Sequence, residues 1–283
     1  MTENILACID GSAYDPLVCD LAAWASRKLA LPVELLHVVQ RKDAVAERRD
    51  LSGAIGLGVK SQLLEELTRL EETDARVQVE RGRLLIARGE ARLTAAGSIG
   101  VTTLHRHGGI VETILEREAE AQMVVMGKRG ASHQFAQDHI GSKVERVVRA
   151  SNKPILIASR GAEPPRVAVL AYDGSAASGR ALEQCARSPL CSDLPVHVVV
   201  VGADDERHRQ LLGTAQASLG ARDVMTTLKP GKPEEAIASV VGATPGAILV
   251  MGAYGHSPLR TLIIGSTTTA MIRTVHVPVL LVR

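Results

Sequence analysis

Aromatic residues are scarce in this sequence. One Trp, three Tyr and one Phe make up 2% of its 283 residues. Proteins that bind single-stranded nucleic acids stack the bases on aromatic side chains, so the scarcity argues against that class. Apolar residues still make up 46% of the chain, and we therefore expect a core built from Ala, Val, Leu and Ile.

An excess of one charge and a long apolar run are also lacking. The 33 Lys and Arg and the 31 Asp and Glu are mixed along the chain and give a net charge of +2, which does not favour nucleic acid or an anionic membrane as a partner. No apolar run approaches the roughly 20 residues that span a bilayer, and the N-terminal residues do not resemble a signal peptide. The four cysteines lack metal-ligand spacing, so we expect reduced thiols and a cytoplasmic location.

The sequence does contain an internal repeat. Residues 5–12 and 167–175 are each a short apolar run that ends in Asp-Gly-Ser. A second apolar run follows at the same distance in both copies, since each of these aspartates precedes a valine by 28 positions. The two pairs are Asp10 with Val38 and Asp173 with Val201.

We interpret the chain as two copies of one domain, 1–160 and 165–283, joined by a linker that contains Gly and Pro. The first aspartate and the first glycine of the later glycine-rich segment are 117 positions apart in the first copy and 79 in the second. The first copy therefore carries about 38 extra residues, mostly the charged segment 41–92. A solvent-exposed helix is the simplest interpretation of this segment, and a lid or a partner-binding arm is the alternative.

Each copy alternates short runs rich in Val, Ile and Leu with segments of helical spacing. In the first copy the runs lie near 4–9, 34–39, 101–104, 123–126 and 154–158. Such runs are typical of buried parallel strands. The alternation predicts an α/β fold in which each domain is a doubly wound parallel sheet with helices on both faces.

The aspartates of the repeat are candidate ligand contacts. In doubly wound sheets, ligands bind beyond the carboxyl ends of the strands, and Asp10 and Asp173 directly follow the first strand of each copy. A carboxylate there can accept hydrogen bonds from a ligand hydroxyl or a base amine. It can equally be a turn or N-cap residue, because Asp-Gly-Ser before a helix is an ordinary turn sequence.

A glycine pattern in the second copy is more specific. Gly252 and Gly255 are followed, after nine residues, by Gly265-Ser266-Thr267, between an apolar run and a helical segment. Glycines let the backbone approach a phosphate, and the amides at a helix N-terminus point at it. The spacing differs from Walker A and from the dinucleotide fingerprint.

This segment resembles the nucleotide signature of the universal stress protein family, Gly-2x-Gly-9x-Gly-Ser/Thr, and the resemblance extends over nearly the whole chain as a tandem pair. It implies a flavodoxin-like fold similar to that of the adenine-nucleotide α-hydrolase superfamily, with ATP, ADP or AMP bound, often with Mg²⁺, and a role as stress sensor or effector. The residues that the resemblance assigns to the nucleotide in the second copy are Asp173, Val201, Met251, Gly252, Gly255, His256, Gly265, Ser266 and Thr267.

The first copy departs from this pattern. Ten residues, including Asp138, separate Gly130 from Gly141, and Lys143 stands where the second copy has Thr267. Because the donors of such a loop act by geometry, we expect weaker nucleotide binding in the first copy. Its corresponding residues are Asp10, Val38, Met126, Gly127, Gly130, Gly141 and Ser142.

Two other functions remain open on the sequence. A slow ATPase or phosphotransfer enzyme would need a base near the terminal phosphate, for which Asp138 and His256 are the candidates. A partner-binding scaffold would need no nucleotide. We expect no metal site formed by protein side chains alone. The resemblance also implies that the last strands of the copies, 155–158 and 279–282, pair within the chain, and a homodimer of the whole chain is a further expectation.

Overall fold

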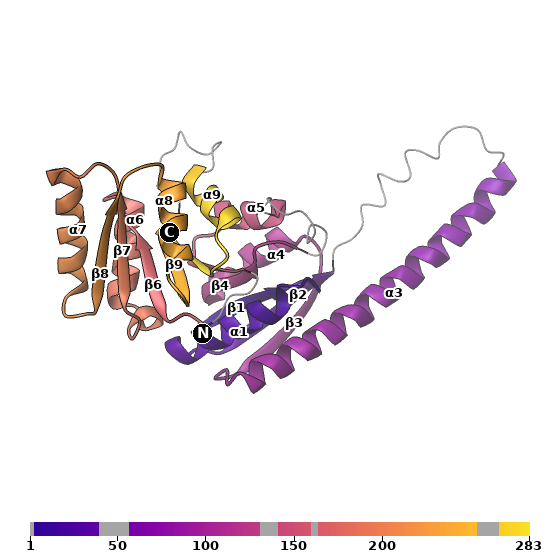
Figure 1. Ribbon diagram of the computed structural model, residues 1–283. Helices are drawn as coiled ribbons and strands as arrows, with labels where there is room; N and C mark the ends of the chain where they lie inside the picture. Colours follow the sequence, from indigo (N-terminus) through magenta and orange to yellow (C-terminus); the bar gives the residue numbers. More distant parts are fainter. Residues whose placement is uncertain (1–2, 40–56, 131–140, 160–163, 254–265) are drawn as a thin grey trace.

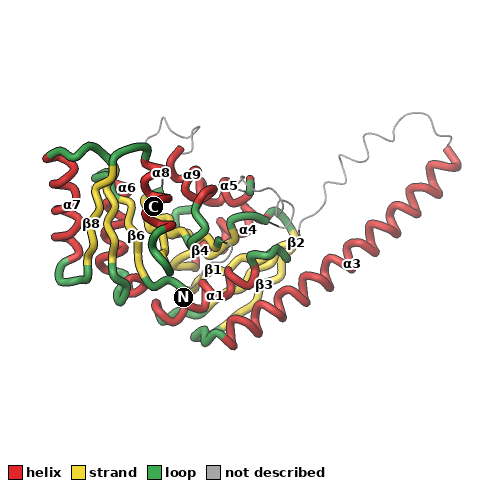
Figure 2. Tube along the Cα trace, viewed as in Figure 1, coloured by secondary structure: helices red, strands yellow, loops and turns green. Residues whose placement is uncertain are grey.

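The computed structural model describes residues 3–39, 57–130, 141–159, 164–253 and 266–283 (Figure 1). Across these residues, ten strands form a single sheet (Figure 2). The strands of the first half are β1 (Asn4–Ile9), β2 (Val33–Val39), β3 (Val101–His107), β4 (Ala121–Gly127) and β5 (Ile155–Ala158). Those of the second half are β6 (Val167–Ala171), β7 (Val196–Val201), β8 (Val224–Lys229), β9 (Ala247–Gly252) and β10 (Val279–Val282).

Helices connect the strands in both halves. The helices of the first half are α1 (Asp15–Leu29), α3 (Leu57–Ala95), α4 (Ile110–Arg117) and α5 (Ser142–Ala150), and the short 3-10 helix η1 (Glu118–Glu120) follows α4. The helices of the second half are α6 (Ala176–Arg187), α7 (Glu206–Leu219), α8 (Pro233–Gly242) and α9 (Ser266–Thr274), and the 3-10 helix η3 (Pro189–Cys191) follows α6. The alternation of strand and helix confirms the predicted α/β class.

The sheet consists of two parallel halves joined edge to edge. The strand order is β3-β2-β1-β4-β5-β10-β9-β6-β7-β8, and the pairs within each half are parallel. β5 and β10 are antiparallel, with Leu156 opposite Leu280. Both halves are therefore doubly wound as predicted, and the last strand of each half pairs with its counterpart in an intrachain pseudo-dimer.

The central strands are apolar on both faces because helices cover both sides of the sheet. In β1, Ile5, Ala7 and Ile9 belong to the core beneath α1, α3, α6 and α7. Leu6 and Cys8, which alternate with them, belong to the core beneath α4, α5, α8 and α9. Each of these two clusters includes residues of both halves, so the pseudo-dimer has a continuous core on each face of the sheet.

Polar contacts also cross between the halves. The buried amine of Lys128, which follows β4, donates to the carbonyl oxygen of Val275 at 3.0 Å. Lys28 at the end of α1 forms an ion pair with Asp193, which follows η3. Both contacts cross the β5–β10 seam, one on each face of the sheet, and hold one half against the other.

The extra segment of the first half contains the long helix α3. This helix has 39 residues, whereas α7, which connects the corresponding strands of the second half, has 14. Its C-terminal part packs on α1, β2 and β3, and its N-terminal part extends away from the rest of the molecule (Figure 1). The predicted helical character of 41–92 is confirmed from Leu57 onward, and 40–56 lie outside the described residues. In the part of the chain that the structure describes, α3 included, no helix is apolar enough along its length to span a membrane.

Candidate functional site

The predicted ligand residues of the first half meet beyond the carboxyl ends of β1 and β4. The strand order reverses between these two strands, and ligands of doubly wound sheets bind at this point. A Cβ atom on Gly130 would lie 2.8 Å from Oδ2 of Asp10, so the end of β1 and the loop after β4 touch. A Cβ atom on Gly141 would lie 3.6 Å from the backbone nitrogen of Gly130. Asp10, Gly130 and Gly141 are therefore neighbours in space.

Helix α5 begins at this same place. Its N-cap residue is Gly141, which has no side chain with which to cap the amides of the first turn, and Ser142 is the first helical residue. Exposed first-turn amides and the helix dipole favour an anion. The position is consistent with the phosphate-binding role predicted for this glycine and serine.

The loop after β1 is closed by a carboxylate that the sequence analysis did not single out. Asp15, in the first turn of α1, accepts hydrogen bonds from the backbone amides of Asp10 at 3.1 Å and Gly11 at 2.8 Å. Burial raises the pKa of Asp15 to about 6, against the opposing effect of the backbone hydrogen bonds. The first site therefore contains two neighbouring carboxylates.

The second half closes the same loop with a hydroxyl. Ser178, at the position equivalent to Asp15, donates from Oγ to Oδ1 of Asp173 at 2.6 Å, and the amide of Ser175 donates to the same oxygen at 2.9 Å. Burial raises the pKa of Asp173, but the hydrogen bonds from Ser175 and Ser178 outweigh it and hold the pKa below its usual value. Asp173 is thus an oriented, ionised carboxylate. The repeat could have revealed this pair of residues, since each lies five positions after the aspartate.

Two of the predicted phosphate-loop glycines are needed for packing. A Cβ atom on Gly127 would lie 2.7 Å from Cβ of Tyr14, and one on Gly252 would lie 2.3 Å from the carbonyl carbon of Ala177. The first turns of α1 and α6 therefore approach β4 and β9 too closely for any side chain there. Gly141 differs, because the atoms nearest to its added Cβ would be in ordinary contact at 3.6 Å. Among the described residues, no contact requires a glycine at that position.

The remaining predicted residues divide into three groups. Val38, Met126 and Met251 are buried in the core and Val201 is half-buried, all at the carboxyl ends of their strands. Ser266 and Thr267 form the start of α9. Gly255, His256 and Gly265 lie outside the described residues, as does Asp138, so the structure places only the two ends of the second glycine pattern.

Helix α3 contributes side chains over the first site that the sequence analysis missed. A Cβ atom on Gly11 would lie 3.2 Å from Cδ1 of Leu85 and 3.5 Å from Nη2 of Arg81. In the second half, α7 supplies Leu211 against Gly174 in the same way. The long helix thus covers the loop after β1 and brings one guanidinium to it.

Histidines gather beneath α3. The ring centroids of His37 and His105 are 5.2 Å apart, and those of His105 and His107 are 6.0 Å apart. Burial, then the neighbouring His105, lowers the pKa of His37 to about 4. A Cβ atom on Gly82 would lie 2.4 Å from Nε2 of His105, so α3 rests directly on these rings. Within the described ranges, no group of three or more His, Cys, Asp and Glu has the arrangement of a metal site.

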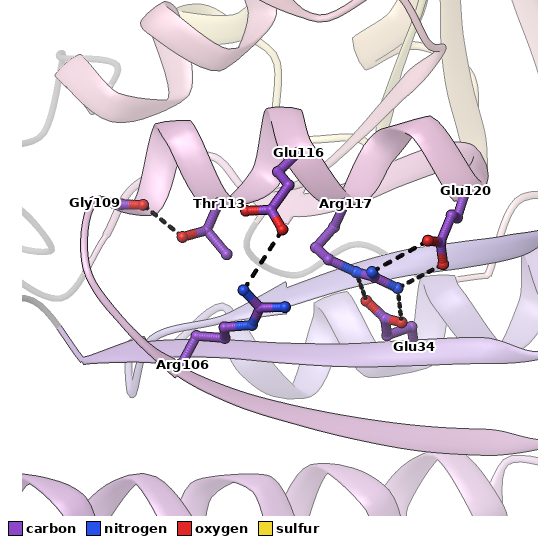
Figure 3. A network of polar contacts seen from close by, with 7 residues as sticks. All are labelled: Glu34, Arg106, Gly109, Thr113, Glu116, Arg117 and Glu120. Atoms are coloured by element: carbon purple, nitrogen blue, oxygen red, sulfur yellow. Dashed lines mark hydrogen bonds and ion pairs between the residues drawn. The ribbon is translucent and has the colours of Figure 1, made fainter.

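A second polar network, on the opposite face, is structural. Arg117 of α4 donates to both carboxylate oxygens of Glu34 on β2, at 2.8 and 2.7 Å, and also to Glu120 (Figure 3). Arg106 of β3 forms an ion pair with Glu116 at 3.5 Å. These contacts fasten α4 to the outer strands, away from the ends of β1 and β4.

Known proteins are similar to this chain in sequence and in fold. A model of the universal stress protein family matches residues 1–159 and 200–283. The universal stress protein Slr1230 of Synechocystis is 35% identical over 286 residues, covering 99% of this chain and 100% of that protein. A universal stress protein of Mycolicibacterium smegmatis is 22% identical over 303 residues, covering 99% and 97%.

The solved structures agree on the fold. A universal stress protein from Archaeoglobus fulgidus superposes with a TM-score of 0.73 at 20% identity, covering 100% of this chain and 99% of that one. The match extends over both halves of this chain. The chain belongs to the universal stress protein family, with two copies of the family's fold joined in one sheet.

Proposed function

We propose that each half binds an adenine nucleotide, ATP, ADP or AMP, and that the second half binds it more tightly. The observation that carries the proposal is the convergence of Asp10, Gly130 and the N-terminus of α5 at the carboxyl edge of the first half. The proposal treats 1–160 and 165–283 as the two nucleotide-binding domains. It assigns the protein a cytoplasmic role as sensor or effector in the stress response.

The chemistry of the site suits such a ligand. Asp10 and Asp173 can accept hydrogen bonds from ribose hydroxyls, and the first-turn amides of α5 and α9 can donate to phosphate oxygens. Oxygen donors are also the ligands that Mg²⁺ prefers, so phosphate oxygens and a carboxylate here fit Mg²⁺ bound with the nucleotide, where it would neutralise phosphate charge. With few rings in the chain, adenine would contact aliphatic residues and backbone near Val38 and Val201.

The difference in affinity follows from the residues that close the two loops. Asp15 adds a carboxylate beside Asp10, and its negative charge opposes phosphate at neutral pH because its pKa is about 6. Ser178 adds a hydroxyl at the equivalent position. The first half also has ten residues between Gly130 and Gly141, where the second half has nine. This insertion should likewise weaken nucleotide binding in the first half.

Titration calorimetry of the full chain with ATP, ADP and AMP, with and without Mg²⁺, tests the proposal through a matched pair of variants. Asp173→Asn and Asp10→Asn each keep an oxygen that can accept from Ser175 or Ser12 but remove the charge. We expect Asp173→Asn to abolish the tighter binding event and Asp10→Asn to affect only the weaker one. Absence of binding heat for all three nucleotides would overturn the proposal, and equal effects of the two variants would overturn the asymmetry.

Gly141→Ala separates binding from folding. Its added methyl group has ordinary contacts with the described residues, so the free energy of unfolding should fall by no more than the roughly 1 kcal/mol that alanine costs at an N-cap. A phosphate held against the backbone of Gly141 would meet that methyl group, and nucleotide binding at the first site should weaken at least tenfold. Unchanged affinity at that site would contradict the proposed position of the phosphates.

A further inference from the structure

Helix α3 carries an exposed stripe of large apolar side chains, which we call the α3 stripe: Leu70, Val77 and Leu84. Their exposed fractions are 66%, 58% and 60%. They are spaced seven residues apart, so they lie along one side of the helix, as one of the two apolar positions of a heptad does. In the sequence, Leu63 and Ala91 continue the same spacing by one heptad in each direction.

The α3 stripe lies on the face of the helix opposite to the one that packs on the sheet. The packed face contains Ile86 and Leu93, which are buried, and Gly89, whose added Cβ would lie 2.7 Å from Cδ2 of Leu35. At 3.6 residues per turn, the α3 stripe is about 180° around the helix from these residues. A partner can therefore cover the stripe without disturbing how α3 is docked.

The N-terminal part of α3 has no cover from its own chain in the described structure. Every described side chain from Glu66 to Gln78 is exposed, and this part of the helix extends away from both halves (Figure 1). Isolated helices in water gain little stability from propensity alone, and most helical stability comes from the packing of an apolar face. A projecting helix with a heptad stripe is thus suited to pair with another helix.

The two segments of α3 carry opposite net charges, and this distribution indicates which partner the helix fits. Residues 57–75 carry two cationic and five anionic side chains, a net charge of −3. Residues 76–95 carry five arginines and two glutamates, a net charge of +3. The helix is therefore complementary to itself only when a second copy runs in the opposite direction.

We propose that α3 is a dimerisation arm that pairs antiparallel with α3 of a second copy of this chain. Val77 lies at the middle of the α3 stripe and near the boundary between the acidic and basic segments, so the two-fold axis passes beside it. Leu70 then lies opposite the partner's Leu84, and Leu84 opposite the partner's Leu70. Each acidic segment faces a basic segment, which a parallel pair would not achieve. The inference is independent of nucleotide binding and goes beyond the proposed function.

Analytical ultracentrifugation of the full chain over a wide concentration range tests the apolar contact. We expect a reversible dimer, and Val77→Asp should raise its dissociation constant at least tenfold, since the two-fold axis brings two added carboxylates together. Met225→Ser is the matched control, because Met225 is similarly exposed at 63% but lies on β8, far along the sheet. A protein that stays monomeric at all concentrations would overturn the proposal, as would a dimer that Val77→Asp leaves intact.

A charge exchange tests the direction of pairing. The double variant Arg81→Glu and Arg88→Glu gives both segments of α3 a net negative charge, and Glu66→Lys with Asp74→Lys gives both a net positive charge. All four side chains are exposed and lie within about 60° of the α3 stripe around the helix. Each variant alone should dimerise less than the wild-type chain, and an equimolar mixture should form a mixed dimer, because every acidic segment then meets a basic one. If the separate variants dimerise as the wild type does, the antiparallel pairing is wrong.

Discussion

The two halves share a turn after their first strand, but different side chains close this turn and helices of different length cover it. In the first half the turn is closed by Asp15 and covered by a 39-residue helix; in the second it is closed by Ser178 and covered by a helix of 14 residues. Both halves keep the aspartate, the parallel strands and the close helix–strand contact. The comparison indicates that the two halves share the fold of this edge of the sheet and differ in the residue that closes the turn and in the length of the helix that covers it.

The largest effect on the free energy of unfolding is expected where an added methyl group meets a neighbouring helix, at Gly252 and Gly127. Gly252→Ala places a methyl group 2.3 Å from the backbone of Ala177, whereas Gly127→Ala places one 2.7 Å from the side chain of Tyr14. Cβ of Tyr14 moves only with its backbone, so both variants should be destabilised, and the closer overlap at Gly252 should cost more. We expect Gly252→Ala to lower the free energy of unfolding by about 3 kcal/mol and Gly127→Ala by about 2 kcal/mol. Chemical denaturation measures both values.

Gly213→Ala in α7 is the control for this comparison. No atom lies within 4 Å of its added methyl group, and alanine favours a helix over glycine by about 0.5–1 kcal/mol, so this variant should be slightly more stable than the wild type. Equal losses for Gly127→Ala and Gly252→Ala would contradict the argument that α6 approaches β9 more closely than Tyr14 approaches β4.

The histidines beneath α3 should make the first half sensitive to acid. His37 has a pKa of about 4, lowered first by burial and then by His105, so the unfolded chain binds this proton more readily than the folded one between pH 4 and 6.5. The contribution of His37 to the free energy of unfolding should therefore fall, by about 2 kcal/mol, as the pH drops through this range. The second half has Val200 at the equivalent position.

His37→Val copies the second half and should remove most of this pH dependence, whatever its effect on stability at neutral pH. Fluorescence of Trp24, the only tryptophan, which is buried in α1, reports unfolding of the first half. His276→Gln, at an exposed position in the second half, is the control and should leave the slope unchanged. An unaltered slope for His37→Val would assign the acid sensitivity to other groups.

Much of the fold could be predicted because it depends on the order and spacing of apolar runs along the sequence. The strands follow from apolar runs, and the pairing of β5 with β10 follows from the resemblance to tandem family members. The approach of Asp10 to Gly130 follows from the rule that places ligands at the carboxyl edge. What could not be predicted depends on distances between elements. The contacts of Gly127 with Tyr14 and of Gly252 with Ala177 arise from how the helices pack on the sheet, and the spacing of the glycines does not reveal them.

Asp15 was missed for a different physical reason. In the sequence it is one acidic residue at the start of a helix, which is the commonest place for one and carries no further information. Only the structure shows that it is partly buried and accepts from two amides of the loop. The projecting part of α3 was similarly underdetermined, since a charged amphipathic segment predicts a helix but not which of its faces the sheet covers.

The smallest expected effects come from exchanging the residues that close the two turns, with the variants Asp15→Ser and Ser178→Asp. Because burial raises the pKa of Asp15 to about 6, the folded chain holds this proton more tightly than the unfolded one. The contribution of Asp15 to the free energy of unfolding therefore falls by about 2 kcal/mol as the pH rises from 4 to 6. Asp15→Ser should remove this fall, whereas Ser178→Asp should introduce a similar one in the second half. Denaturation at pH 4.5 and 7.5 gives the difference for each variant.

The same exchange should move nucleotide affinity in opposite directions. Asp15→Ser removes a negative charge beside Asp10 and should strengthen binding at the first site, and Ser178→Asp places one beside Asp173 and should weaken binding at the second. If the pH dependence is exchanged but the affinities are not, the carboxylate acts only on folding. If neither is exchanged, the loop closures are equivalent, and the asymmetry must come from the glycine-rich segments, where the first half has one residue more between its last two glycines.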